Sequence, residues 1–253
     1  MSLLQHLSAR ASHAPQITCL IDQTGAWTYA RLWSRIEQLA QALSRLDARR
    51  VSSALDNGGD AIALDLALRL IGAVHLPLPG FFTDTQVAHA QSSAAVDVHV
   101  SQQKSPNSLA FGAGIYALPL VALYPSALPA TTGLITYTSG STGTPKGVCL
   151  SAAHLDQVSA AIVDALAGAT PQRHLCLLPL SVLLEQVAGV GAALLANAVV
   201  VIPPLSETGL SGAAQLDPLQ LANCIQKYQP ESLILVPQML QAWMYALAQG
   251  ASA

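Results

Sequence analysis

The stretch Ile135-Thr136-Tyr137-Thr138-Ser139-Gly140-Ser141-Thr142-Gly143-Thr144-Pro145-Lys146-Gly147-Val148 joins an apolar strand pattern to a loop rich in glycine and hydroxyl side chains. Its glycines allow positive φ and let backbone N–H groups come close to anionic oxygens. Its serine and threonine hydroxyls can donate hydrogen bonds or bind a metal ion. Lys146 adds a positive charge at the end of the loop. The stretch therefore predicts a polyphosphate-binding loop.

Three other interpretations of this stretch fit less well. A Ser/Thr/Gly-rich surface linker is the common alternative, but a linker has no reason to follow an apolar strand or to lead into the helical pattern that begins at Ser151. A Walker A loop requires G-x-x-x-x-G-K-[ST], whereas Lys146 here follows Pro145 and precedes Gly147. A dinucleotide-binding G-x-G-x-x-G is not present in the stretch either.

Residues Tyr137 to Val148 resemble the phosphate loop of the adenylate-forming superfamily, Y-T-S-G-[ST]-T-G-x-P-K-G-V, at every fixed position. This superfamily includes acyl-CoA and aryl-CoA synthetases, the adenylation domains of peptide synthetases and beetle luciferases. Two scaffold segments also look like the family: Trp27-Thr28-Tyr29 with the amphipathic pattern after it, and Gly72 to Leu78, which is similar to G-A-[VI]-x-x-P-[LV].

The segment Leu178 to Gln186 is similar to the family's L-P-L-x-H-x-x-E-R, which lines the acyl pocket. The resemblance implies a substrate pocket that includes Pro179, Leu180, Val182 and Glu185. However, Val182 stands where an aromatic or histidine gate is usual, and Gln186 where the long-chain branch often has arginine. The identity of the acid therefore cannot be carried over from the family.

The resemblance implies an AMP-forming carboxylate:thiol ligase with ATP and Mg²⁺ as cofactors. A carboxylate attacks the α-phosphorus of ATP, pyrophosphate leaves, and the acyl-adenylate is captured by CoA or an acyl carrier protein. By position, Thr138 would hold Mg²⁺ and Lys146 would neutralise the leaving pyrophosphate, which makes these two the catalytic candidates. The phosphates would be wrapped by Ser139, Gly140, Ser141, Thr142, Gly143 and Thr144.

The substrate class stays open at this point. The N-terminal half looks like ligases that load hydroxybenzoate-type aromatic acids, and a fatty-acid ligase is the alternative. Neither Y-G-x-T-E, nor T-G-D, nor the family's C-terminal lysine motif occurs in the 253 residues. By resemblance these motifs would supply the magnesium-binding glutamate, the ribose-binding aspartate and the catalytic lysine. Members of the family have a large domain followed by a C-terminal lid. We therefore expect this chain to be an N-terminal part of that large domain, and to be inactive or nearly so in isolation. A short homologue that binds ATP without turnover remains a second possibility.

Composition favours a soluble, cytoplasmic origin and agrees with an α/β domain. Hydrophobic residues make up 52% and charged residues 10% of the sequence, as expected when central strands are buried on both faces. A net charge of −3 without a Lys/Arg-rich run argues against a nucleic-acid partner. The four cysteines are scattered without metal-ligand spacing, which favours buried thiols in a reducing compartment.

Helical and strand patterns alternate along the chain, which predicts an α/β fold with mostly parallel sheets flanked by helices. We expect a first α/β subdomain at 1–101, a crossing segment at 102–130 and a second subdomain with the phosphate loop at 131–253. The expected helices are 29–46, 60–71, 83–92, 151–167, 183–196, 215–228 and 237–248, and the expected strands are 51–55, 74–78, 96–100, 133–137, 174–178, 198–202 and 232–236.

The apolar run from Val187 to Leu205 is long enough to suggest a membrane span. Turn signals favour a different interpretation: a buried helix to about Ala196, a turn at Asn197, and a strand that ends before Pro203-Pro204. A helix that carried a β-branched run into two prolines would be poorly formed. We therefore predict no membrane span.

Overall fold

The computed structural model describes residues 1–121, 127–138, 146–166, 169–212 and 215–248. The chain divides into two compact units. Unit 1 comprises 1–31, 56–59 and 156–253, and unit 2 comprises 32–55 and 60–155. Each unit has its own sheet and is described separately below.

The sheet of unit 2 has seven strands in the order β6-β7-β5-β3-β4-β8-β9. Its central strands are parallel to one another, and the strands at both edges are antiparallel to their neighbours. The parallel strands are β3 (Arg50–Ala54), β4 (Val74–Pro77), β5 (Val98–Ser101) and β8 (Leu134–Thr138). The strands in antiparallel pairs outside them are β6 (Leu109–Gly112), β7 (Ile115–Pro119) and β9 (Lys146–Leu150).

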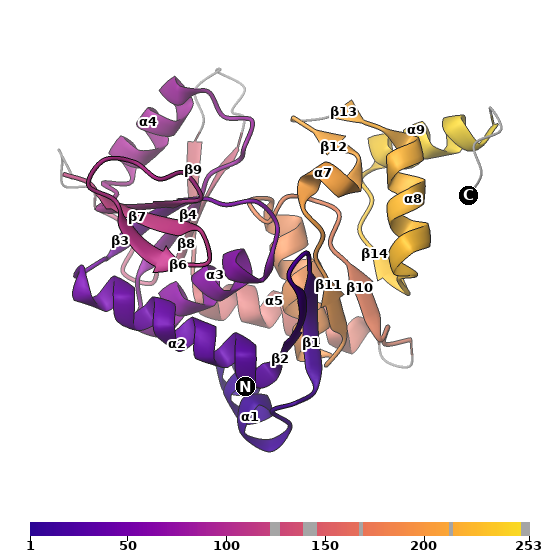
Figure 1. Ribbon diagram of the computed structural model, residues 1–253, viewed down its shortest axis with the longest axis horizontal. Coiled ribbons are helices and arrows are strands. Elements are labelled where there is room, and N and C mark those ends of the chain that lie inside the picture. Colours follow the sequence, from indigo (N-terminus) through magenta and orange to yellow (C-terminus); the bar gives the residue numbers. More distant parts are fainter. Residues whose placement is uncertain (122–126, 139–145, 167–168, 213–214, 249–253) are drawn as a thin grey trace. The chain divides into compact units, whose positions relative to one another are not determined.

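Helices cover both faces of this sheet (Figure 1). They are α2 (Tyr29–Arg45) and α3 (Gly59–Ile71) on one side and α4 (Asp84–Ser93) on the other. On the α3 side, the ring of His75 hydrogen-bonds Asp65 at 2.8 Å and Ser53 at 2.9 Å. Burial would raise the pKa of the Asp65 carboxyl, but Arg69 and His75 more than offset that effect and lower it. These contacts fix α3 against the middle of the sheet.

Unit 1 contains a five-stranded sheet in the order β14-β10-β11-β1-β2. Four strands are parallel, and only the edge strand β2 is antiparallel to its neighbour. The strands are β1 (Thr18–Asp22), β2 (Gly25–Thr28), β10 (Arg173–Leu175), β11 (Val199–Val201) and β14 (Ser232–Leu233), with a separate hairpin of β12 (Leu210–Ser211) and β13 (Gln215–Leu216). The helices are α1 (Leu3–His13), α5 (Ala152–Ala165), the π-helix η1 (Glu185–Gly191), α6 (Ala192–Leu195), α7 (Leu205–Thr208), α8 (Pro218–Tyr228) and α9 (Pro237–Ala248).

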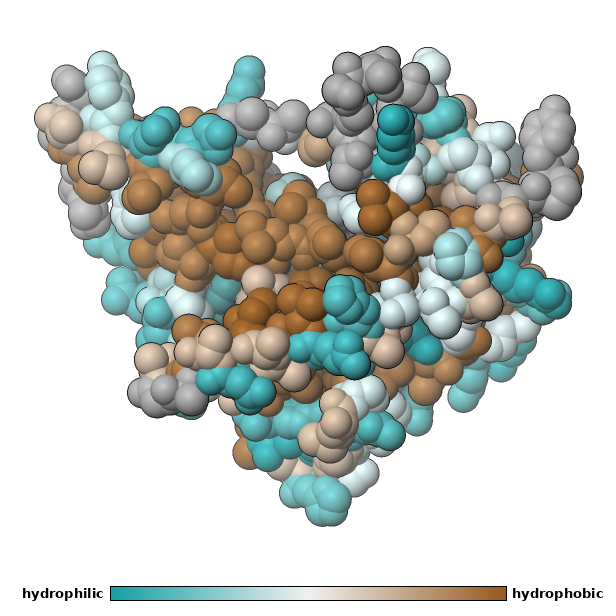
Figure 2. Space-filling view, turned by 180° about the vertical axis from the view of Figure 1, so that it is seen from behind, coloured by the Kyte–Doolittle hydropathy of each residue, from teal (hydrophilic) through white to brown (hydrophobic). Residues whose placement is uncertain are grey.

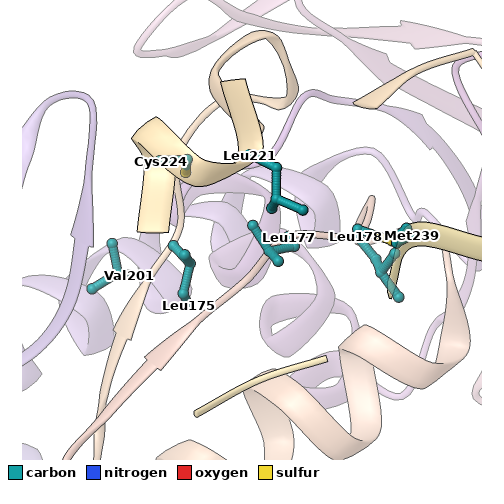
Figure 3. Close-up of a cluster of buried hydrophobic side chains, with 7 residues drawn as sticks. All are labelled: Leu175, Leu177, Leu178, Val201, Leu221, Cys224 and Met239. Atoms are coloured by element: carbon teal, nitrogen blue, oxygen red, sulfur yellow. The ribbon is translucent and has the colours of Figure 1, made fainter. Parts of the chain in front are cut away.

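One hydrophobic cluster in unit 1 joins strand residues to helices α8 and α9 (Figure 3). Its members are Leu175, Leu177, Leu178, Val201, Leu221, Cys224 and Met239, all 5% exposed or less. Hydrophobic side chains also reach the surface, as the brown areas in Figure 2 show. Among them, Leu240, Met244 and Tyr245 of α9 are 44, 61 and 70% exposed. A chain with 52% hydrophobic residues thus exposes apolar surface besides burying a core.

The predicted fold class is confirmed, and so is the interpretation of the long apolar run. Residues 185–195 form η1 and α6, Asn197 has a positive φ of 60°, and β11 follows at 199–201. Asparagine tolerates this left-handed conformation, so the turn signal was correct. Within the ranges that the structure describes, no helix has the length and hydrophobicity needed to cross a membrane.

The compact units differ from the continuous ranges 1–101 and 131–253 that the sequence suggested. Strand β8, expected in the second subdomain, pairs with β4 at His75↔Leu134 and so belongs to the seven-stranded sheet of unit 2. Strand β1, near the N-terminus, pairs with β11 at Leu20↔Val200 and so belongs to the five-stranded sheet of unit 1. The segment 102–130 supplies β6 and β7 to the edge of a sheet instead of only crossing between subdomains. Pairing between distant strands has no local sequence signature, so the boundaries could not be derived from periodicity.

Candidate active site

The phosphate-loop sequence lies between two paired strand ends of unit 2. Strands β8 and β9 are antiparallel neighbours, and their register places Thr138 directly opposite Lys146. The predicted phosphate-binding residues Ser139, Gly140, Ser141, Thr142, Gly143 and Thr144 lie outside the described residues. Of the two catalytic candidates, Lys146 is exposed at the start of β9, and only the backbone of Thr138 is described.

The position of this hairpin in the sheet is that of a ligand site in α/β proteins. Strand β8 runs parallel to β4, which in turn runs parallel to β3. The loop after Thr138 therefore leaves the carboxyl edge of the parallel strands. Ligands of open α/β sheets bind outside this edge. The described residues on either side of the predicted loop, Thr138 and Lys146, thus lie at the edge of the sheet where such ligands bind.

The segment predicted to line the acyl pocket, 178–186, lies in unit 1. Its first residues are hydrogen-bonded by Asn57, which the sequence did not indicate as a functional residue. Asn57 is 3% exposed. Its amide donates to the carbonyl of Leu178 and its side-chain oxygen accepts from the N–H of Leu180, both at 3.0 Å. Pro179 and Leu180 are half-buried. The Asp56-Asn57-Gly58-Gly59 turn composition was the available signal, although it predicts only a turn.

Two of the predicted pocket residues pack into the interior of unit 1. Val182 is half-buried and lies against the cluster of Figure 3. Glu185 is fully buried. One oxygen of its carboxylate is 3.0 Å from Nε2 of His174, and the other accepts from the N–H of Leu178 at 2.9 Å. Glu185 therefore holds the segment in place and does not face a surface that an acid could reach.

A glycine of the π-helix, Gly189, leaves room for the Glu185–His174 pair. A Cβ at Gly189 would collide with the Glu185 carboxylate and with Nε2 of His174, so only glycine fits there. On its other side, the His174 ring is 3.0 Å from the Ser232 hydroxyl. His174 was not singled out by sequence analysis, because a lone histidine in an apolar strand carries no motif.

A cavity of about 300 Å³ in unit 1 lies beside this pair. It is lined mainly by aliphatic residues of α5 and of the η1–α6 segment, together with His174 and Ser232. None of Pro179, Leu180, Val182 and Glu185 lines this cavity. The predicted acyl segment and this cavity are therefore separate features of unit 1.

Three of the four cysteines are unsuited to nucleophilic chemistry. All four are free, three of them are buried and Cys149 is half-buried, which confirms the prediction of buried thiols for those three. Burial raises the pKa of Cys19 to about 12 and that of Cys224 to about 11, and it raises the pKa of Cys176 as well. Since the thiolate is the reactive form, these side chains are structural. The described part of the chain contains no group of three or more His, Cys, Asp and Glu side chains that could hold a metal ion.

Comparison with known proteins agrees with this architecture. The chain is 28% identical to fumosorinone synthetase of Cordyceps fumosorosea over 96% of its own length and 6% of that protein. The N-terminal subdomain of Klebsiella oxytoca NpsA, solved with 3-hydroxybenzoyl-AMSN, is 22% identical with a TM-score of 0.67, over 89% of this chain and 57% of that one. The o-succinylbenzoate coenzyme A synthetase of Bacillus subtilis, solved with ATP and magnesium ion, is 18% identical with a TM-score of 0.70, over 94% of this chain and 65% of that one.

The two solved structures show a shared fold, and the chain spans less than two thirds of the length of each of these three proteins. The family evidence comes from a further comparison. The family model described as "AMP-binding enzyme" matches residues 7–253, which is nearly the whole chain. The phosphate-loop sequence and the mostly parallel sheets with flanking helices agree with that match. The chain therefore belongs to the family of AMP-binding enzymes.

Proposed function

We propose that this chain carries the phosphate-binding part of an enzyme that adenylates a carboxylic acid with ATP and then passes the acyl group to a thiol. The observation that carries the proposal is the phosphate-loop sequence between Thr138 and Lys146, which lie opposite each other at the carboxyl edge of the parallel strands of the seven-stranded sheet. Membership in the AMP-binding family supports it.

The chemistry explains why such a loop is needed. A carboxylate must approach the α-phosphorus of ATP, which already carries negative charge, so catalysis depends on positioning and on positive groups around the polyphosphate. In this proposal the Lys146 ammonium neutralises charge on the departing pyrophosphate, and backbone N–H groups and hydroxyls from Ser139 to Thr144 hold the β- and γ-phosphates.

We propose that Thr138 contributes to a magnesium site. Hydroxyl and phosphate oxygens are the hard ligands that Mg²⁺ prefers, so the donor set of the loop fits the ion. A bound Mg²⁺ would supply further positive charge next to the phosphates. The solved coenzyme A synthetase with ATP and magnesium supports the same pair of cofactors for this chain.

For the substrate we propose a hydroxybenzoate-type aromatic acid, with CoA or an acyl carrier protein as the acceptor in the cytoplasm. The solved Klebsiella oxytoca subdomain with its 3-hydroxybenzoyl ligand supports an aromatic acid. A fatty acid is the alternative. Pyrophosphate exchange with a panel of aromatic and aliphatic acids, using the adenylating enzyme that contains this chain, tests the proposal. Exchange with no acid in the panel would refute it.

The 253 residues alone are expected to form no acyl-adenylate at a useful rate. The family's ribose-binding aspartate motif and C-terminal lysine motif have no counterpart among them, so the isolated chain would lack contacts that the adenylation step requires. Pyrophosphate exchange by the purified chain, compared with its Lys146→Ala variant as a blank, is the measurement. Robust exchange that depends on Lys146 would show that these residues suffice for the chemistry.

The Val182→Phe enzyme is expected to use larger acids less well, because the added ring would fill part of the pocket. Its affinity for ATP should be unchanged. In a packed apolar pocket, a modest change of shape alters preference between substrates by ~1 to 3 kcal/mol. The acid panel, measured with the enzyme that contains this chain, gives the preference directly.

Val182 also packs against the core cluster of Figure 3, so Val182→Phe could lower stability instead of changing acid preference. A second residue of the same kind provides the control. Ile225 also packs against the cluster but lies on α8, outside the predicted acyl segment. Ile225→Phe should therefore lower stability without altering preference. If Val182→Phe behaves in the same way, Val182 is a core residue and the assignment of residues 178–186 to the acyl pocket is wrong.

A further inference from the structure

Tyr137 connects the strand before the phosphate loop to a helix that has no part in the motif. It is the fourth residue of β8 and immediately precedes Thr138. Its hydroxyl donates to the carbonyl of Ala90 at 3.1 Å and is 2.5 Å from Oγ of Ser93. Ala90 and Ser93 both belong to the last turn of α4. The Ser93 hydroxyl also donates to the Ala90 carbonyl at 3.2 Å, so the two hydroxyls share this acceptor and either can donate to the other.

The ring of Tyr137 is held as firmly as its hydroxyl. It meets the ring of Phe82 edge to face, with centroids 6.5 Å apart and an interplanar angle of 83°. It also packs against the buried cluster of Leu76, Leu78, Ala90, Ala94, Val96 and Ile135. Burial raises the pKa of the Tyr137 phenol, so the hydroxyl keeps its proton at neutral pH. The side chain thus joins β8 to α4 through both apolar and polar contacts.

Directly across the ladder, the ring of Tyr137 takes the space that a side chain at position 147 would need. Tyr137 and Gly147 are register partners. A Cβ on Gly147 would lie 3.1 Å from Cγ2 of Ile135 and 3.2 Å from Cζ of Tyr137, both tighter than ordinary contacts. This packing gives a physical reason for glycine after Lys146. The Tyr137–Gly147 pair therefore allows the ring to lie across the hairpin.

The next pair along the ladder is Thr138 and Lys146. These are the two residues proposed to act on the polyphosphate, and each is covalently next to a member of the Tyr137–Gly147 pair. A strand advances by ~3.4 Å per residue, so a change in the position of Tyr137 would be transmitted to the base of the loop with little loss. Groups that bind a reacting phosphate need placement to within a fraction of an ångström.

We propose that Tyr137, anchored to Ala90 and Ser93 of α4 and packed across Gly147, is a positioning residue that fixes Thr138 and Lys146 for polyphosphate binding. This inference rests on the proposed function of the loop. It assigns a role to α4, and to the exposed Ser93 in particular, that the loop motif does not contain.

Calorimetric titration of the 253-residue chain with magnesium ATP, and with magnesium tripolyphosphate as the polyphosphate alone, tests the inference. Tyr137→Phe and Ser93→Ala should each weaken binding by about three- to tenfold, as expected for the loss of one hydrogen bond. The double variant should bind no more weakly than the weaker of the two single variants, because the hydroxyls act as a unit. Ser93→Thr, which keeps a hydroxyl, should restore binding.

A tyrosine of the same sheet provides the control. Tyr116 on β7 is also half-buried, and Tyr116→Phe should leave the affinity unchanged. Since Ser93 is exposed, Ser93→Ala should fold normally and keep its thermal unfolding temperature. Wild-type binding with unchanged affinity in Tyr137→Phe and Ser93→Ala would overturn the positioning role alone. No binding by the wild-type chain would overturn the proposed function of the loop, and this inference with it.

Discussion

Replacing Lys146 with alanine is expected to lower the catalytic efficiency of adenylation by about ten- to hundredfold and to leave the fold intact. The ammonium group would lose a charge-assisted contact to the polyphosphate worth ~1.5 to 3 kcal/mol. Lys146 is exposed at the first position of β9, so its removal leaves no buried group without a partner. Steady-state pyrophosphate exchange by the enzyme that contains this chain, with kcat and KM for magnesium ATP determined separately, measures the effect.

Two variants make this result specific to position 146. Lys104 is an exposed lysine of the same unit, and Lys104→Ala should leave the rate unchanged. Lys146→Arg keeps the charge and should retain part of the activity, since arginine places its charge differently. An unchanged rate for Lys146→Ala would show that Lys146 is a solvated surface lysine without a role at the phosphates.

Replacing Glu185 with alanine is expected to destabilise unit 1 by ~3 to 5 kcal/mol, the usual cost of removing one partner from a buried pair of ionisable side chains. The carboxylate is fully buried and bonds both Nε2 of His174 and the N–H of Leu178. Without it, two polar groups stay buried and unsatisfied, and a cavity opens. Urea unfolding followed by tryptophan fluorescence reports the loss, and Trp33→Phe as the common background leaves Trp27 and Trp243 of unit 1 as the fluorophores.

The control for this prediction is a substitution of nearly the same volume. Glu185→Gln keeps an oxygen that can accept from Leu178 and should be much less destabilising than Glu185→Ala. Glu231→Ala, at an exposed carboxylate of the same unit, should have a small effect. A changed acid preference in Glu185→Ala with nearly wild-type stability would instead support the acyl-pocket role that the resemblance implies.

Most of the secondary structure could be predicted because its signals are local. The expected helix at 237–248 agrees with α9, and the expected strand at 74–78 with β4 at Val74–Pro77. The break at Asn197 was visible as a turn residue between a helical and a β-branched pattern. Elements with weaker patterns were missed: α1 at the N-terminus, the β1–β2 pair, and the β6–β7 hairpin in a segment rich in proline.

In the candidate site, too, the features that are local in sequence could be predicted, and the contacts between distant residues could not. The glycines, hydroxyls and lysine of the phosphate loop are consecutive in the chain, so the sequence by itself determined the motif, the family and the kind of ligand to expect. It could not determine that Thr138 pairs with Lys146 across the ladder, that the Tyr137 hydroxyl contacts Ser93, or that Glu185 is buried against His174. Those contacts depend on which strands pair and which helix covers them. Such pairing is decided by the free energy of the whole packed unit, to which many weak contacts between distant residues contribute, and therefore only the tertiary structure fixes it.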